Sequence, residues 1–182
     1  MRISTEHIRF ISEKIAHELI NSKMVAFTRG EDPVIDAAGK RIEEEVKLEK
    51  AVDAEVNRIM SEHDDDISFY QADPKQAFWL IKRRIADQYG LILEKEERFN
   101  NLAHKVLDDL YEEDLISYTV SENLVKNAIC KAILDFGRRH EELEDKVHDK
   151  LRNYKRKVQR GSVEYDILYE KFYEEELAKT RL

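Results

Sequence analysis

The residues best suited to chemistry in this sequence are histidines and carboxylates that recur three or four positions apart. On a helix this spacing puts two side chains on one face, where an imidazole and a carboxylate can hold a metal ion. Such pairs are Glu13/His17, His104/Asp108, His140/Glu144 and Asp145/His148. With 39 acidic residues and six histidines these spacings also arise by chance, and the sequence contains no Glu-x-x-His motif, no His-Glu-x-x-His motif and no pair of cysteines. We therefore expect ordinary helix-surface pairs and no metal ion.

The sequence offers no nucleophile in a recognisable catalytic setting. Cys130 is the single cysteine, and no histidine near it in the sequence could serve as its base, so we expect a small buried or boundary residue. The five glycines lie too far apart for a phosphate-binding loop or a Gly-x-Ser-x-Gly elbow. These absences predict no catalytic residue, no cofactor and no enzymatic activity.

A basic stretch stands out because the chain as a whole is acidic, with a net charge of -8. Residues 150–160 hold six bases and no acid. On a helix they would form an arc able to neutralise phosphates, with a tyrosine available to stack on a base. The alternative is a solvated face balanced by acidic surfaces of the same chain, such as Glu174–Glu176. The candidate nucleic-acid-binding residues are Lys150, Arg152, Tyr154, Lys155, Arg156, Lys157 and Arg160.

Aromatic residues gather in and near the last predicted helix of each half of the chain. In the first half they are Phe69, Tyr70, Phe78, Trp79 and Tyr89, with the shorter basic run Lys82–Arg84 beside them. The simplest interpretation of this group is core, and the alternative is that some of it forms an exposed patch for a partner. In the final helix we place the aromatics on more than one face, which favours a contact surface for a protein partner or for a second copy. Packing in the core is the alternative. These candidate interface residues are Tyr165, Tyr169, Phe172 and Tyr173.

The elements that position these residues are predicted to be helices. Five glycines and two prolines in 182 residues are too few for the turns of a sandwich or barrel, so an all-α fold remains. The longest apolar run, Ala77–Ile81, is far shorter than the ~18 residues of a membrane-spanning helix, and the first residues lack the apolar region of a signal peptide. We therefore expect no membrane association and a location in the cytoplasm.

Several residues predict where the helices begin and end. Asp-Pro pairs typically start helices, so helices are expected to begin at Pro33 and Pro74, whereas Gly90 and Gly161 are expected to follow helix ends. The segments 24–28 and 115–119 lose the helical period and are predicted to be extended connectors that form a small ribbon at most.

The second helix of the first half has an irregular apolar stripe. Its apolar residues recur at helical spacing up to Val46 and then jump six positions to Val52. We expect a kink or a break near Leu48–Ala51, with a continuous helix as the alternative. Gly39 lies within the same region, where glycine is disfavoured. It could allow a close crossing of the second helices of the two halves, or it could simply be tolerated near a kink.

The two halves of the chain resemble each other. Residues 6–63 align with residues 97–154 at a constant offset of 91, and beyond residue 75 the offset becomes 87. The apolar residues of the first helix recur in the second half, as Ile8, Ile11, Ile15 and Leu19 are followed by Phe99, Leu102, Val106 and Leu110. The sequence therefore predicts two tandem pseudo-symmetric helical repeats, residues 1–91 and 92–182, with about four helical segments each.

The N-terminal pattern also resembles a known family. The residues that carry the likeness are Met1-Arg2-Ile3-Ser4, Ile8, Ile11-Ser12, Ile15 and Leu19, followed by the duplicated helix, connector and helix units. This pattern is similar to the bacterial family catalogued as domain of unknown function 507, across essentially the whole chain. The resemblance implies a small cytoplasmic bacterial protein, and it brings no catalytic or binding residues.

Together these observations favour a protein that acts through its surface. The leading hypothesis is a non-enzymatic helical interaction or adaptor protein that contacts a protein partner, or itself, through the C-terminal aromatic helix. The alternative is a nucleic-acid-associated protein that uses the basic residues 150–160. An enzyme has no motif to support it.

Overall fold

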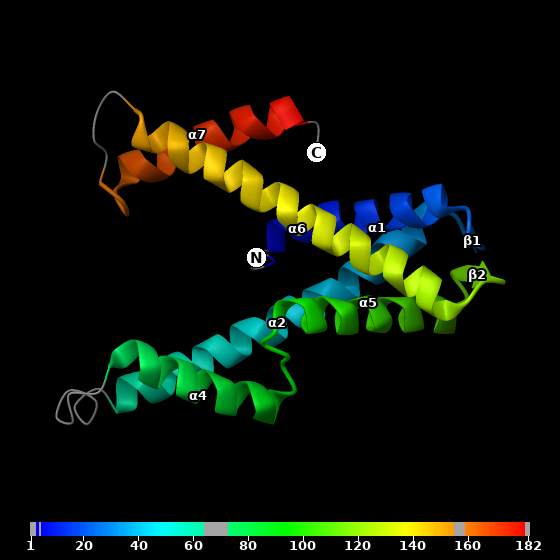
Figure 1. Ribbon diagram of the computed structural model, residues 1–182, viewed down its shortest axis with the longest axis horizontal. Helices are drawn as coiled ribbons and strands as arrows, with labels where there is room; N and C mark the ends of the chain where they lie inside the picture. Colours follow the sequence, from blue (N-terminus) through cyan, green and yellow to red (C-terminus); the bar gives the residue numbers. More distant parts are fainter. Residues whose placement is uncertain (1–2, 4, 64–72, 155–158, 181–182) are drawn as a thin grey trace. The chain divides into compact units, whose positions relative to one another are not determined.

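The protein is all-helical apart from a short β-ribbon, as the sequence predicts. The computed structural model describes residues 3, 5–63, 73–154 and 159–180. Figure 1 traces its elements along the chain. In order they are the 3₁₀ turn η1 (Thr5–His7), α1 (Ile8–Ser22), β1 (Val25–Phe27), α2 (Glu31–Glu62), α4 (Pro74–Tyr89), α5 (Lys95–Glu112), β2 (Ile116–Tyr118), α6 (Glu122–Arg152) and α7 (Val163–Thr180).

The chain divides into two compact units, Arg2–Ile133 and Leu134–Leu182. The larger unit contains every element from η1 to β2 together with the first part of α6. The smaller unit contains the remainder of α6 and all of α7. The boundary between the units thus falls inside a continuous helix.

The two extended connectors pair with each other in the larger unit. β1 and β2 are antiparallel, and Ala26 lies opposite Ser117 at the centre of the ribbon. The Thr28 N–H donates to the Leu115 carbonyl at 3.0 Å, which extends the pairing by one bond. The prediction of a small ribbon is therefore confirmed.

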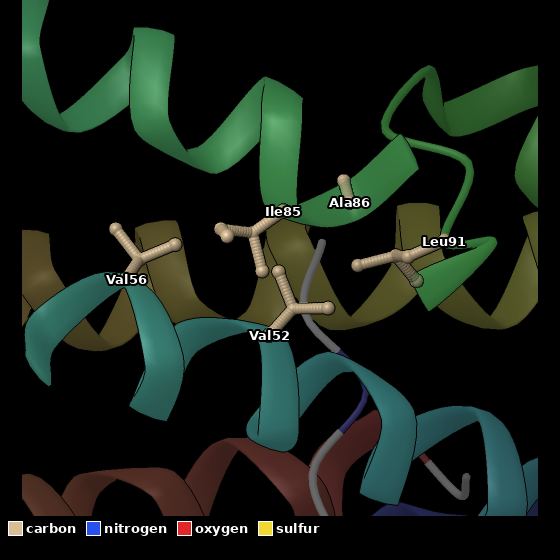
Figure 2. Close-up of a cluster of buried hydrophobic side chains, with 5 residues drawn as sticks. All are labelled: Val52, Val56, Ile85, Ala86 and Leu91. Atoms are coloured by element: carbon tan, nitrogen blue, oxygen red, sulfur yellow. The ribbon is translucent and has the colours of Figure 1, made fainter. Parts of the chain in front are cut away.

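Of the alternatives left open for the second helix, the break is wrong and the continuous helix is confirmed, because α2 runs without interruption for 32 residues. The jump in its apolar stripe marks a change of partner. Before the jump the buried residues include Ile42 and Val46, and after it Val52 and Val56 pack against α4. Figure 2 shows both valines pointing toward Ile85 on α4, with Ala86 and Leu91 completing the cluster.

Helix α2 also packs closely on α1, and Gly39 lies at the contact. A Cβ added at Gly39 would lie 3.2 Å from Ser12 Oγ and 3.7 Å from a methyl carbon of Ile8. Ser12 is fully buried, and its hydroxyl donates to the Ile8 carbonyl at 2.7 Å. The glycine therefore makes room for α1, and the expected close crossing of the second helices of the two halves does not account for it.

Ion pairs join α2 to α5 along an antiparallel contact. The Arg41 guanidinium donates to both carboxylate oxygens of Asp109, at 2.5 and 2.6 Å. Further along, Arg98 donates to Glu45 at 2.8 Å and to Glu49 at 3.0 Å. The Arg98 side chain is only 12% exposed, so its charge depends on these two carboxylates for compensation.

Most of the predicted helix boundaries are close to those observed. Asp73 caps α4 by accepting a bond from the Lys75 N–H, and Gly90 follows the helix in the left-handed conformation. Pro33 is less well predicted, because α2 begins two residues earlier at Glu31, with Gly30 as its N-cap. Gly161 has a φ of 83° and lies in the turn before α7, well beyond the end of α6.

The Gly39 contact predicts how substitutions at this position affect stability. Gly39→Leu should lower the free energy of unfolding by about 1–3 kcal/mol, because the larger side chain is forced against the buried Ser12. Gly39→Ala in a Ser12→Ala background should instead be stabilised, by up to about 1 kcal/mol relative to Ser12→Ala alone, because the helix gains an alanine without the clash. Urea denaturation measures both, with Lys40→Leu at an exposed neighbour as control. Equal stability of Gly39→Leu and the control would contradict the tight contact.

The Arg98 ion pairs predict a second, larger effect. Arg98→Met should lower the free energy of unfolding by about 2–4 kcal/mol, because Glu45 and Glu49 lose the guanidinium that compensates their charges. Arg58 is the matched control, since it also bonds two glutamates, Glu55 and Glu62, but lies on one helix and is 54% exposed. Arg58→Met should leave the urea midpoint nearly unchanged. A similar loss for both variants would show that burial of Arg98 is not what matters.

Candidate functional site

The predicted aromatic contact on the final helix lies inside the smaller unit. Tyr165, Tyr169, Phe172 and Tyr173 all lie on the face of α7 that packs on α6, so their assignment to more than one face is wrong. Their spacing of three and four residues explains the single face. Phe172 belongs to a buried cluster with Leu143 and Val147, and Tyr169 and Tyr173 pack against its edge.

The rings of this face form a continuous series with the histidines of α6. Tyr169 stacks with Tyr165 and Tyr173, with ring centroids 6.4 and 6.1 Å apart. The His148 ring lies 5.8 Å from that of Tyr169, and the His140 ring lies 5.9 Å from that of Tyr173. Contacts of this kind add packing energy within the helical hairpin. These aromatics therefore hold α7 to α6.

The tyrosine hydroxyls of the series reach polar groups of α6. The Tyr173 hydroxyl lies 3.3 Å from His140 Nδ1, and the Tyr169 hydroxyl donates to Glu144 at 3.4 Å. Burial, reinforced by the Glu144 carboxylate, raises the pKa of Tyr169 to about 12. Tyr169 thus keeps its proton, and the contact between α6 and α7 consists of hydrogen-bonded structural groups.

The basic stretch is not the continuous helical arc that the sequence suggests. Helix α6 ends at Arg152, and the Tyr154 N–H bonds the Leu151 carbonyl in a closing turn. The Tyr154 ring packs on Phe172, with centroids 5.8 Å apart. Lys155, Arg156 and Lys157 lie outside the described residues.

Lys150 of this stretch is neutralised by α7. Its ammonium group lies 2.9 Å from Glu175 and 2.8 Å from Glu176, and it also sits over the Phe172 ring at 5.3 Å. Hydrogen bonds from Lys150 and Lys179 lower the pKa of Glu176 to about 2. These contacts support the alternative interpretation for Lys150, in which acidic residues of the same chain balance it. Arg152 and Arg160 remain exposed, and they line a shallow hollow with His148, Leu151 and Tyr165.

The surroundings of the candidate metal ligands and of the candidate nucleophile do not support a functional site. His104 lies 3.6 Å from Asp108 and 3.7 Å from Glu122, but all three side chains are exposed. Burial raises the pKa of Cys130, although Lys126 opposes the shift, and this disfavours the reactive thiolate. Among the described residues, no buried polar side chain without a hydrogen-bond partner lies beside either of them.

An exposed apolar surface lies on the outer side of α4. Trp79 does not lie in the core, which is the simpler interpretation of its aromatic group, because it is 59% exposed, and its neighbour Leu80 is 67% exposed. Helix α4 buries its other side, centred on Ile85 and Ala86, against α2. We call the exposed side the α4 outer face; it surrounds a shallow hollow lined by Lys75, Gln76, Trp79, Leu80 and Arg83.

The Trp79 ring is held in place although it faces solvent. The Phe78 ring meets it edge to face at 5.9 Å, and the Lys82 ammonium lies 5.7 Å from the Trp79 ring centroid. Lys82 is itself anchored by Asp53 of α2, at 2.7 Å. A large apolar ring is thus presented to solvent while Phe78 and Lys82 contact it.

The chain matches a known protein family over its whole length. The model of the family described as "Protein of unknown function (DUF507)" matches residues 1–182, the whole chain. The chain belongs to this family. The resemblance noted from the N-terminal pattern is therefore confirmed. No curated protein matches the chain. Membership of DUF507 assigns no activity, so function must be argued from the surfaces described above.

Within the part of the chain that the structure describes, no helix is both long enough and apolar enough to cross a membrane.

The lowered pKa of Glu176 predicts a pH dependence of the smaller unit. A carboxylate whose pKa falls from 4.5 to about 2 on folding contributes stability above pH 4.5 that is lost as the pH falls toward 2. The stability difference between wild type and Glu176→Gln should therefore be largest near neutral pH and should shrink at about pH 2.5. Thermal unfolding followed by circular dichroism measures it. Glu174→Gln, at an exposed neighbour, serves as control, and a difference that stays constant with pH would contradict the assignment.

Proposed function

We propose that this DUF507 protein is a helical interaction protein that binds a protein partner through the α4 outer face. The observation that carries the proposal is Trp79, a large aromatic side chain that is exposed yet fixed by Phe78 and Lys82. Tryptophan and arginine are the residue types that most often dominate binding energy in protein interfaces. The α4 outer face supplies both, as Trp79 and Arg83 line one hollow.

The fixed ring also lowers the cost of binding. A side chain that is already ordered loses less conformational entropy when a partner covers it. The anchor runs from Asp53 through Lys82 to Trp79, so it connects the exposed ring to the contact between α2 and α4. The stable packing of α4 on α2 therefore supports a preformed binding surface.

Nucleic-acid binding through the basic stretch is the second candidate. Arg152 and Arg160 support it, because both are exposed and line one hollow beside Tyr165. The support is weaker than for the α4 outer face, because Lys150 is already paired with Glu175 and Glu176.

The bacterial source and the cytoplasmic location that the resemblance implies stay predictions.

We also propose that the chain is a tandem duplication, with α1, β1, α2 and α4 equivalent to α5, β2, α6 and α7. At the offset of 91, β1 at 25–27 corresponds to 116–118, the bounds of β2, and the start of α2 at residue 31 corresponds to the start of α6 at residue 122. The two non-glycine residues with positive φ among the described residues, Lys23 and Asp114, are also equivalent at this offset. These correspondences support a shared origin for the two halves.

The ribbon and two ion pairs support a local two-fold relation between the halves. Ala26 pairs with Ser117, its own equivalent at the offset of 91, as a two-fold axis through the ribbon requires. Two ion pairs follow the same relation. Glu18 of α1 pairs with Lys131 of α6. Its equivalent Asp109 pairs with Arg41 of α2, which is one residue away from the equivalent of Lys131.

A capture experiment tests the proposed function. In nuclease-treated extract of the source cells, the tagged wild-type protein should retain protein partners, and Trp79→Ser should lose them because the central apolar contact is gone. Leu124→Ser is the control, since Leu124 is a half-exposed apolar residue of α6 in the same unit. Retention of the same partners by Trp79→Ser would contradict the proposal. Loss of all partners on nuclease treatment would favour the nucleic-acid alternative.

A further inference from the structure

A second exposed apolar face lies on α7, on the side away from the aromatic series. Val163 is 76% exposed and Ile167 is 61% exposed, which is unusual for β-branched apolar residues. The same helical stripe continues with Glu170 and Glu174, both exposed. We call this stripe the α7 outer face. The packing of the smaller unit leaves it uncovered, because the buried residue Phe172 lies on the opposite side of the helix.

The α4 and α7 outer faces carry opposite charges around their apolar centres. On α4 the exposed charged residues are three bases and one acid, Lys75, Arg83, Arg84 and Asp87. On and beside the α7 stripe they are three acids and one base, Asp166, Glu170, Glu174 and Lys171.

Neither set of charges is neutralised where it stands. Within the part of the chain that the structure describes, Lys75, Arg83 and Arg84 form no ion pair, and the same is true of Asp166, Glu170 and Glu174. By contrast, Lys82 and Glu175, on the inner sides of these helices, are paired with Asp53 and Lys150. The outer faces thus retain charge that a partner of opposite sign can neutralise.

We propose that the α4 outer face of one copy of the chain docks on the α7 outer face of a second copy. The apolar centres, Trp79 and Leu80 on one side and Val163 and Ile167 on the other, would be buried together, with Arg83 and Glu170 among the charges that surround them. The inference rests on the proposed function, because it uses the same α4 surface and names its partner. The two faces differ, so the contact is heterologous, and repeated docking gives open chains or closed rings.

The contact is expected to be weak. A single helix face against another buries less than the ~1,200 Å² below which complexes are transient. The opposite charges should speed encounter and make the association sensitive to salt. The apolar centre distinguishes this site from a surface for nucleic acid, which would need mainly basic groups along a backbone track.

The first test is self-association of the full-length wild-type protein. Sedimentation velocity at increasing concentration should show species larger than a monomer, with the weight-average coefficient falling as salt is raised. Trp79 is the single tryptophan of the chain, so its emission should shift to shorter wavelength over the same concentration range as it becomes buried. A wild-type protein that stays monomeric at about 1 mM, a concentration at which even weak complexes form, would overturn the inference.

The second test uses two variants that each disable one face. Leu80→Asp removes the α4 contact and Ile167→Asp removes the α7 contact, so each protein alone should remain monomeric. Mixed in equal amounts they should form a dimer and nothing larger, because each retains the face that the other lacks. Both residues are exposed, and helical content by circular dichroism checks that both variants fold. Leu124→Asp is the control and should associate like wild type.

The outcomes separate this inference from the proposed function. A mixture that remains monomeric, or single variants that still dimerise, would overturn docking between the two outer faces. If the wild type stays monomeric while Trp79→Ser still loses protein partners in the capture experiment, the self-association is wrong and the α4 outer face binds a different protein. If the wild type stays monomeric and Trp79→Ser also retains its partners in the capture experiment, the proposed function is wrong as well.

Discussion

The structure of the larger unit depends on α2, a single helix that presents its apolar residues in two directions. Over its first half it buries Ile42 and Val46, and over its second half it buries Val52 and Val56 against α4. Six residues turn a helix by about 240°, so the second stripe faces a different neighbour from the first. Because the backbone stays helical throughout, the orientation of α4 is set by the same rigid element that packs on α1 and α5. The exposed side of α4 follows from this constraint, since its buried side is already committed.

In the smaller unit, the aromatic residues of α7 pack on one another and on α6. The residues of α7 that most resemble an interface, Tyr165, Tyr169 and Tyr173, stack with one another and reach α6 through their hydroxyl groups. An aromatic ring with a polar tip can serve an interface or a partly wet helix contact equally well. Composition therefore could not decide between these roles. The packing of α6 against these tyrosines assigns them to the helix contact. The surface left for binding on α7 is the stripe of Val163 and Ile167.

The parts of the fold that could be predicted are those with a local physical cause. The ribbon follows from the loss of helical period at 24–28 and 115–119, and the start of α4 follows from the cap by Asp73 before a proline. The continuity of α2 could not be predicted, because a jump in the apolar stripe looks the same whether the helix breaks or changes partner. The sequence could not decide between core and exposed patch for Trp79 for a related reason. Phe78, Trp79, Leu80 and Ile81 cover most sides of α4, and only the contact of α4 with α2 selects the side that is buried.

On the proposed duplication, α4 and α7 are equivalent helices, and their outer faces carry opposite charge at one central position. At the offset of 87, Leu80 corresponds to Ile167 and Arg83 corresponds to Glu170. Two outer faces of like charge would repel each other between copies, and two faces without charge would favour unspecific aggregation. The reversed charge at Arg83 and Glu170, beside the equivalent apolar residues Leu80 and Ile167, instead favours contact between unlike halves and disfavours contact between like halves. Each outer face is exposed within its own unit because the inner side of the same helix already packs on a neighbouring helix.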